Sequence, residues 1–580
     1  MARKRKRRQP HGGSARPGRF RDEVEEGALA SALREAYDKL PEKRRADLQG
    51  GHGSKETEAS PGSGESPDRK PRPAPESRSS SGADEWAWVG GMHSPTVRVT
   101  TPDPGRSRLI RAAGNHDVAR PVGTTRTQVS DKPGEPRDLV IGIDLGTSCS
   151  KVVLRDAATR DAFAVPFGKL AHEGHPYLLP SLVRVARNGS LSLTSGDFLA
   201  DHVKLRLVRA PDGVVLRDTK RASEISGREL AAGYIALVLR LVREWFLDTH
   251  DARYRNVSLR WHLNLGMPSK DSDDEAQKRE FEWVGTAAWL ASVAAGELGV
   301  GSVKGAMKEA RTFLDAGRRW PLVPEAQQDA RLWEVCILPE VIAEVVGYAQ
   351  SDLKRHGTHL LVDVGAATLD VATFILHEAE GEDRYGILTT AVEYLGAYAL
   401  HGKRCSAVAK AVEDHIQKQI QSVDGIAPLP ESDSYRVPVQ SVIEAVDEQV
   451  KNQCLQAVFR VVDDTRKNRD PKPFLRREFS LPVITCGGGS RMDLYSAAVR
   501  GVRKYLALIK GLDEIQLPFP KQLLADGLTR DEYHRLAVAY GLSFLSVEIG
   551  SITPAHAIED IPPDHNRQNW SDSFIGKDLM

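Results

Sequence analysis

One sequence pattern occurs twice in this chain, and it constrains the fold more than any other feature. The two segments are IDLGTSCSKVVL, which contains Asp144 and Gly146, and VDVGAATLDVAT, which contains Asp363 and Gly365. The aspartates and the glycines are each 219 positions apart, so the segments superpose without a gap. In each segment an apolar strand ends in an aspartate, a glycine turn follows, and a second strand returns. We interpret the repeat as a duplication that gives two lobes facing a common cleft.

The rest of the sequence after residue 137 alternates between strand and helix patterns. SLRWHLNLGMP, HLLVDVG and VITCGGGS are apolar runs that end in turns, whereas SGRELAAGYIALVLRLVREWF and VIAEVVGYAQ keep a helical period. Strands that alternate with long helices are typical of α/β proteins. The sequence therefore predicts an α/β fold.

The chemistry of the repeated turns favours a bound phosphate chain and a metal ion. A glycine turn lets backbone amides approach an anion closely, and the hydroxyls of Thr147, Ser148 and Thr368 add donors. Aspartates repel phosphate directly, but they suit a Mg²⁺ ion that keeps most of its waters. One such segment alone would be an ordinary Asp–Gly turn. Two copies in register favour a nucleotide site.

Several further motifs appear in a fixed order. CGGGSRM covers Cys486 to Met492, LPEVIAEVVGY places Glu340 eight residues before Tyr348, and HRLAVAYGLS, LPSLVRV and SGDF lie elsewhere. The chain resembles the superfamily of actin, DnaK-type heat-shock chaperones and sugar kinases. In this resemblance the two repeats correspond to the first and second phosphate motifs, and CGGGSRM corresponds to the adenosine motif. The resemblance spans roughly 138–550. It is closest to the nucleotide-binding part of the chaperones.

The resemblance implies a two-lobed actin-like ATPase fold, built from duplicated ribonuclease-H-like domains. We expect lobe I over 138–358, lobe II over 359–550 and a C-terminal tail over 551–580. Within this sequence we expect no chaperone substrate-binding β-domain after residue 550.

The resemblance also implies that ATP and Mg²⁺ are the cofactors, and it assigns roles to individual residues. The expected catalytic residues are Asp144, Glu340, Asp363 and Thr368, with Asp144 and Asp363 holding Mg²⁺ through water. The expected nucleotide contacts are Gly146, Thr147, Ser148, Lys151, Gly365, Gly487, Gly488, Gly489, Ser490 and Arg491.

The sequence departs from the chaperone pattern at two places. Ala366 and Ala367 stand where chaperones usually have glycines, which predicts slower hydrolysis. Ala200 stands where they carry a phosphate-facing lysine. Lys151 instead has the spacing of a phosphate-contacting lysine in actins and many sugar kinases, although a solvated strand lysine is the simpler alternative.

Three functions fit these motifs. The first is a slow, chaperone-like Mg²⁺-dependent ATPase that acts as a conformational switch on an unidentified protein partner. The second is an actin-like filament-forming ATPase, and the third is a small-molecule (sugar-type) kinase. The glutamate-bearing connecting helix at Glu340 speaks against the kinase.

The first 137 residues differ in charge and composition from the rest. They carry 27 Lys and Arg against 19 Asp and Glu, whereas the remainder carries 53 against 60. Residues 51–100 include 22 Gly, Pro and Ser, a composition that buries too little apolar surface to fold. We expect a disordered basic arm over 1–137. It would bind an acidic or nucleic-acid partner, contact the acidic body, or remain a solvated charged tail.

Other features indicate the compartment. No apolar run approaches the roughly 20 residues of a membrane helix, and the basic start MARKRKRRQP is not followed by an apolar stretch. The five cysteines show no C-x-x-C pair. We therefore expect a cytoplasmic protein that does not contact the membrane.

Overall fold

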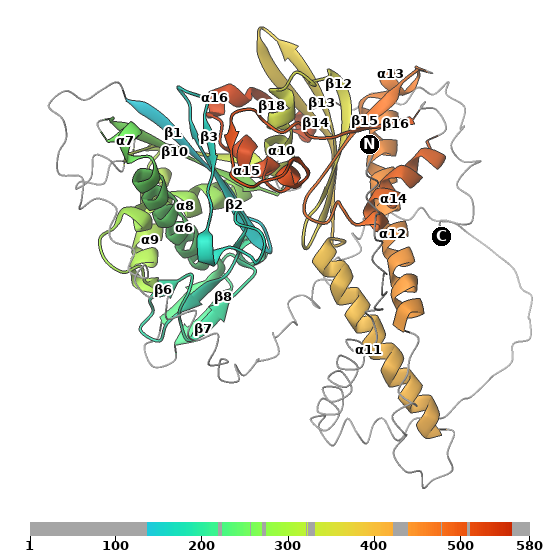
Figure 1. Cartoon of the computed structure of the whole chain (residues 1–580), viewed down its shortest axis with the longest axis horizontal. Coiled ribbons are helices and arrows are strands. Elements are labelled where there is room, and N and C mark those ends of the chain that lie inside the picture. Colours follow the sequence, from blue (N-terminus) through green and yellow to red (C-terminus); the bar gives the residue numbers. More distant parts are fainter. Residues whose placement is uncertain are drawn as a thin grey trace, which may run out of the picture. The chain divides into compact units, whose positions relative to one another are not determined.

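The structure is a computed structural model, and it describes residues 136–559 except 219–222, 256, 269–273, 319, 321, 323–330, 422–438, 477 and 507–510. These residues all belong to one compact unit. They form a mixed α/β structure with two large mixed sheets (Figure 1), so the predicted fold class is confirmed at this level. The basic arm expected over 1–137 lies outside the described residues as far as residue 135.

The first sheet has seven strands. Their order is β11 (Leu332–Pro339), β10 (Leu259–Met267), β1 (Arg137–Asp144), β2 (Cys149–Asp156), β3 (Ala162–Ala164) and β17 (Leu523–Leu524), and β4 (Leu179–Pro180) pairs with β2. Two small sheets consist of β6 (Leu191–Ser192), β5 (Val183–Val185) and β7 (Phe198–Ala200), and of β8 (Val214–Asp218) and β9 (Ser223–Ser226).

The second sheet has six strands and repeats the layout of the first. Their order is β16 (Gly511–Ile515), β15 (Ser480–Cys486), β12 (Gly357–Val364), β13 (Leu369–Ala379), β14 (Glu382–Glu393) and β18 (Ser551–Thr553). In each sheet the first three strands in chain order form an antiparallel meander, β1–β2–β3 or β12–β13–β14. The next two strands then add in parallel on the other side of the first strand. The duplicated sequence pattern therefore coincides with a duplicated sheet topology.

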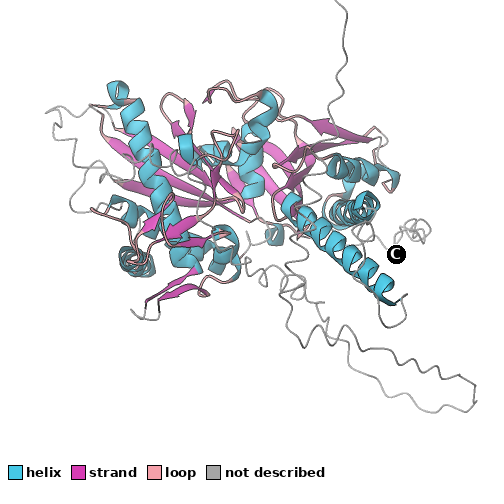
Figure 2. Ribbon diagram, turned by 60° about the horizontal axis from the view of Figure 1, so that its bottom comes forward, coloured by secondary structure: helices cyan, strands magenta, loops and turns pink. Residues whose placement is uncertain are grey.

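Helices lie along the strands (Figure 2). Their bounds are α5 (Val203–Arg209), α6 (Gly227–Thr249), α7 (Asp251–Tyr254), α8 (Glu275–Val293), α9 (Val300–Asp315), α10 (Glu340–Ala349), α11 (Ala397–Gln421), α12 (Val439–Asp464), α13 (Pro471–Phe474), α14 (Asp493–Gly501), α15 (Ala537–Leu542) and α16 (Ser546–Ile549).

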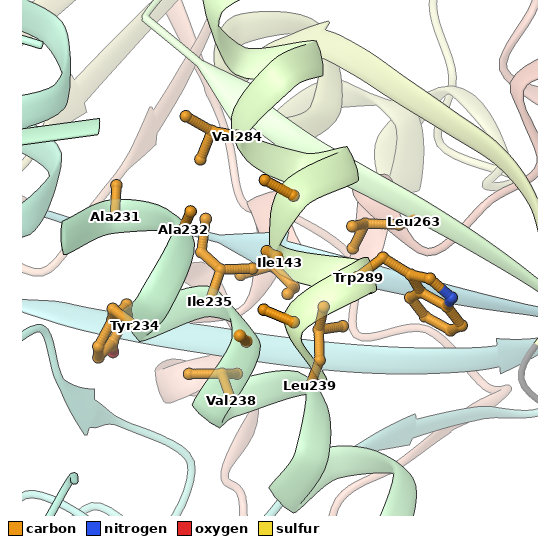
Figure 3. Close-up of a cluster of buried hydrophobic side chains, with 14 of the residues drawn as sticks. Ile143, Ala231, Ala232, Tyr234, Ile235, Val238, Leu239, Leu263, Val284 and Trp289 are labelled. Carbon is orange, nitrogen blue, oxygen red and sulfur yellow. The ribbon is translucent and has the colours of Figure 1, made fainter. Parts of the chain in front are cut away.

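Local signals explain where the two longest helices of the first half begin. Ser226 and Glu229 form a reciprocal capping box at the start of α6, and the Asp274 carboxylate accepts from two amides at the start of α8. Such caps satisfy amides that have no partner inside the helix. Figure 3 shows side chains of both helices gathered on the sheet residues Ile143 and Leu263.

The opposite face of each sheet packs against the same two helices, α10 and α15. One core cluster combines Val153 of β2, Leu361 of β12 and Phe374 of β13 with apolar residues of these helices. All ten residues of α10 are buried. The outer face of the second sheet packs instead on α12 and α14. The helices α10 and α15 thus lie between the two sheets.

The two central helices cross at very short range. A Cβ added at Gly541 of α15 would lie 1.7 Å from the carbonyl oxygen of Ala343 in α10. A Cβ at Gly142 of β1 would lie 2.5 Å from the carbonyl carbon of Leu542. Glycine is therefore required at both contacts, because any side chain would force the backbones apart.

The structure corrects the expected segment boundaries at two points. The segment 359–550 was expected to form lobe II alone, but its Leu523–Leu524 strand joins the first sheet beside β3 and its helix α15 packs on β1. The tail expected from residue 551 begins with β18, which pairs with β14 of the second sheet. Single short strands of this kind lack a sequence period that could reveal them.

Two further observations concern the expected compartment. Within the described residues, no helix combines the length and the apolar character that crossing a membrane requires. All five cysteines are free.

Candidate nucleotide-binding site

The two hairpins place equivalent residues at equivalent positions of their sheets. In the first hairpin Asp144, the last residue of β1, pairs with Lys151 of β2. In the second, Asp363 of β12 pairs with Asp370 of β13. The Lys151 ammonium interacts electrostatically with both Asp144 and Asp363. The structure therefore brings the corresponding ends of both repeats to one place.

The first turn is tight and is supported by Ser181, the residue that follows strand β4. A Cβ at Gly146 would lie 2.2 Å from the carbonyl oxygen of Cys149. The hydroxyl of Ser181 donates to the Gly146 carbonyl at 2.7 Å, and its amide donates to the Ser148 carbonyl at 2.8 Å. Thr147 and Ser148 lie in this turn as predicted, and Ser148 is exposed. Sequence reasoning missed Ser181, although it belongs to the LPSLVRV motif.

The second turn is held by the start of α11. The Gly365 amide donates to the Thr368 carbonyl at 2.9 Å and closes the turn. The amides of Ala397 and Tyr398 donate to the carbonyls of Gly365 and Ala366 at 3.0 and 2.7 Å. These bonds use the amides that a helix start leaves without internal partners. Nothing in the sequence analysis pointed to this helix.

The glycine turn after β15 packs directly on the second hairpin. Gly487 has φ +79°, and a Cβ there would lie 2.0 Å from Oδ1 of Asp363. The Gly489 amide donates to the Val364 carbonyl at 2.9 Å. At Gly488 an added Cβ would meet nothing within 4 Å, so this residue borders open space. The expected adenosine motif and second phosphate motif are therefore neighbours.

The two polar side chains that follow the glycines of that motif, Ser490 and Arg491, bind the protein itself. The hydroxyl of Ser490 donates to the Gly487 carbonyl at 2.8 Å. The guanidinium of Arg491 donates to the carbonyl of Asp531, in the short 3-10 helix Arg530–Arg535. Their side chains thus fix the turn to its surroundings.

Lys151 is anchored by the aspartate opposite it. Its Nζ lies 2.8 Å from Oδ2 of Asp144, which is 6% exposed. Burial alone would lower the pKa of Lys151, but the carboxylates of Asp144 and Asp363 raise it above its usual value. Lys151 is therefore a fully charged cation inside the site and not a solvated strand lysine.

A second lysine enters from α5. The Nζ of Lys204 lies 2.6 Å from both carboxylate oxygens of Glu340, the first residue of α10. Burial opposes the charge, but Glu340 and Asp144 raise the pKa of Lys204 to about 12. Ala200, where the sequence lacks the expected lysine, is buried at the end of β7. Sequence reasoning missed Lys204 because it lies four residues beyond the expected position.

Five carboxylates gather around these lysines, and we call them the acidic cluster. Its members are Asp144, Glu340, Glu344, Asp363 and Asp370, which are linked by mutual electrostatic interactions. Burial, and then the neighbouring Asp370 and Glu340 carboxylates, raise the pKa of Asp363 to about 7. A small pocket is lined by four cluster members: Glu340, Glu344, Asp363 and Asp370. Burial, and then the neighbouring carboxylates, also raise the pKa of Glu340 and of Glu344. A bound cation would offset this repulsion and favour the ionised form of these acids.

Sequence reasoning assigned no site role to two members, Asp370 and Glu344. Glu344 lies one helical turn after Glu340 on α10 and is 2% exposed. A carboxylate inside the apolar run VIAEVVGYA is the signal that could have identified it.

Comparisons with known proteins add no assignment. No family model matches the chain, and no curated protein matches it either.

Proposed function

We propose that this chain binds Mg²⁺-ATP between its two sheets and hydrolyses it slowly, as a chaperone-like conformational switch with an actin-like, two-lobed fold. The observation that carries the proposal is the pair of sheets with one strand order, each ending its first strand in an aspartate of the acidic cluster. Both repeats and the GGGS turn lie at this cluster, which supports the proposal. Its expected functional residues come from segments more than 300 positions apart.

The residues present fit Mg²⁺. The Oδ1 atom of Asp363 is buried and makes no hydrogen bond within the described part of the chain, and a cation would relieve the repulsion that raises the pKa of Asp363. Asp144 and Asp363 would hold the ion through its waters. When bound, Mg²⁺ would neutralise charge on the phosphates.

Side chains and backbone amides of the chain would bind the phosphates and orient the attacking water. Lys151 and Lys204, both charged, lie where they would attract phosphate oxygens, and the amides of the two glycine turns would donate to them. The Glu340 carboxylate, fixed by Lys204 at 2.6 Å, would orient an attacking water. Thr368 would reach the terminal phosphate from the second turn. Ala366 and Ala367 limit backbone approach there, which is why we expect slow turnover.

Calorimetry on the full chain tests the site. We expect ATP to bind only with Mg²⁺, and Asp144→Asn and Gly488→Val to weaken binding more than about tenfold. Gly488→Val suits the purpose because the space at its Cβ is open, so the fold tolerates the larger side chain. Asp352→Asn is the matched control, since that carboxylate is 98% exposed on another loop. Unchanged affinity in both site variants would refute the proposal.

Two assays separate the alternative functions. ATP turnover without any acceptor molecule agrees with an ATPase and opposes a small-molecule kinase. If ATP increases light scattering by the purified chain, the chain forms filaments, and a filament-forming ATPase becomes the better interpretation than a conformational switch.

A further inference from the structure

Three side chains of types that can bind metal ions lie close together at the acidic cluster, and they come from different elements. They are Glu344 in α10, Asp363 at the end of β12 and Cys486, the last residue of β15. One ligand atom of each residue lies within 4.8 Å of those of the other two. These elements are distant in sequence, so the fold and not local spacing creates the group.

Two carboxylate oxygens of this group lack the partners that buried polar atoms normally have. Glu344 is 2% exposed, and its Oε1 makes no hydrogen bond within the described part of the chain. The Oδ1 atom of Asp363 is also buried and makes no hydrogen bond there. The thiol of Cys486, with no exposed surface, makes a hydrogen bond with the Glu344 carboxyl group and a weak contact of 3.7 Å with the Val362 carbonyl. Buried carboxylate oxygens without partners are costly and need an explanation.

The nearby cations do not fill this role. Lys151 is bound to Asp144 at 2.8 Å and Lys204 to Glu340 at 2.6 Å. Each lysine is therefore already paired with an acid other than Glu344 and Asp363. Glu344, Asp363 and Cys486 together would bring three negative charges, which a divalent cation would largely neutralise.

The ligand types select the ion. Mg²⁺ and Ca²⁺ are bound by oxygen, whereas a thiolate with carboxylates suits Zn²⁺ and related transition metals. We propose that Glu344, Asp363 and Cys486 bind a Zn²⁺-type divalent ion, with water as a further ligand. The ion would displace the thiol proton of Cys486. This ion would share Asp363 with the Mg²⁺ of the proposed nucleotide site, but its other ligands, Glu344 and Cys486, belong to it alone, and it requires no nucleotide.

Such an ion would connect the central helix to the second sheet. Glu344 lies in α10, whereas Asp363 and Cys486 end the two neighbouring strands that carry the second phosphate turn and the GGGS turn. A bound metal would fix these two turns relative to α10.

Cobalt titration of the full chain tests the proposal. The protein is reduced, stripped with a chelator, and titrated with Co²⁺ without nucleotide. We expect one equivalent to give a near-ultraviolet thiolate-to-cobalt charge-transfer band, which Zn²⁺ then abolishes because it binds more tightly. Glu344→Gln, which keeps the volume and removes the charge, should weaken binding more than about tenfold. Cys486→Ser should remove the band, and circular dichroism would show that both variants fold.

The control is Cys405→Ser. Cys405 is exposed and its sulfur lies 3.5 Å from Nε2 of His401, so it is a second place where cobalt could meet a thiol. The band should survive this substitution. Absence of the band in the unmodified protein, its persistence in Cys486→Ser, or its loss in Cys405→Ser would overturn the proposal. Gly488→Val should keep the band even if it loses ATP, so failure of the metal site and failure of the nucleotide site remain distinguishable.

Discussion

Replacing Gly541 with alanine is expected to force apart the two helices between the sheets. The new Cβ would lie 1.7 Å from the carbonyl oxygen of Ala343 and 2.6 Å from its carbonyl carbon. Both are backbone atoms of α10, so no side-chain rotation relieves the clash. Because Cβ contacts below 3.0 Å essentially never occur, the helices must separate by about 1.3 Å. Overpacking of this kind should lower the free energy of unfolding by about 3 kcal/mol.

Gly305→Ala is the matched control. Gly305 lies inside α9, and an added Cβ there would meet nothing within 4 Å. Because alanine loses less backbone entropy in a helix than glycine, this variant should be more stable by about 1 kcal/mol. The same chemical change thus has opposite signs at the two positions.

Thermal unfolding of both variants, followed by circular dichroism, measures the difference. For the roughly 400 residues that the structure describes, 3 kcal/mol corresponds to a fall in Tm of about 3–4 °C, and the Tm of the control should rise by about 1 °C. A Tm for Gly541→Ala equal to or above that of the unmodified protein would show that α10 and α15 are not in close contact.

Three further outcomes are expected. His262 is buried between the carboxylates of Asp138 and Glu334; burial opposes its charge, but these partners raise its pKa above the usual value of about 6.5. Its charged form therefore stabilises the fold below about pH 6.5, and this contribution is lost as pH rises through the folded-state pKa. In urea unfolding, His262→Asn should lower the free energy of unfolding more at pH 6 than at pH 9. An equal loss at both pH values would contradict the raised pKa of His262. The Arg240 guanidinium donates to four carbonyls around the end of α8 at 2.8–3.1 Å; Arg240→Met should cost about 3 kcal/mol in urea unfolding, and a cost below about 1 kcal/mol would mean that these bonds contribute little. Thr368→Ala should lower kcat about a hundredfold and change ATP affinity less than about threefold, whereas a raised Michaelis constant at unchanged kcat would place Thr368 in ground-state binding.

The sequence revealed those parts of the fold that repeat or keep a period. Two apolar strands with aspartates in register predicted hairpins, and the structure has both, with Asp144 and Asp363 in one cluster. Lys204 and Ser181 were missed because their roles depend on contacts with Glu340 and Gly146, far away in sequence. A single sequence carries no record of such tertiary contacts.

Similar reasoning explains the missed boundaries. β17 and β18 are two and three residues long, too short to show alternation. They are strands only because the edges of β3 and β14 offer them hydrogen-bonding partners. Their positions follow from the completed sheets, which the sequence pattern does not contain.

The return of α15 to the first sheet has a consequence during synthesis on the ribosome. All strands of the first sheet except β17 are complete once β11 has emerged, but Leu542, which packs against Gly142 of β1, emerges about 200 residues later. At roughly 5–20 residues per second, the part of this face that α15 covers over β1 and β2 stays exposed for about 10–40 s. A nascent chain stalled before residue 537 therefore exposes an apolar surface that the finished protein hides. The first half of this molecule cannot mature ahead of the second, and a chain released early would present that surface to holdase chaperones and proteases.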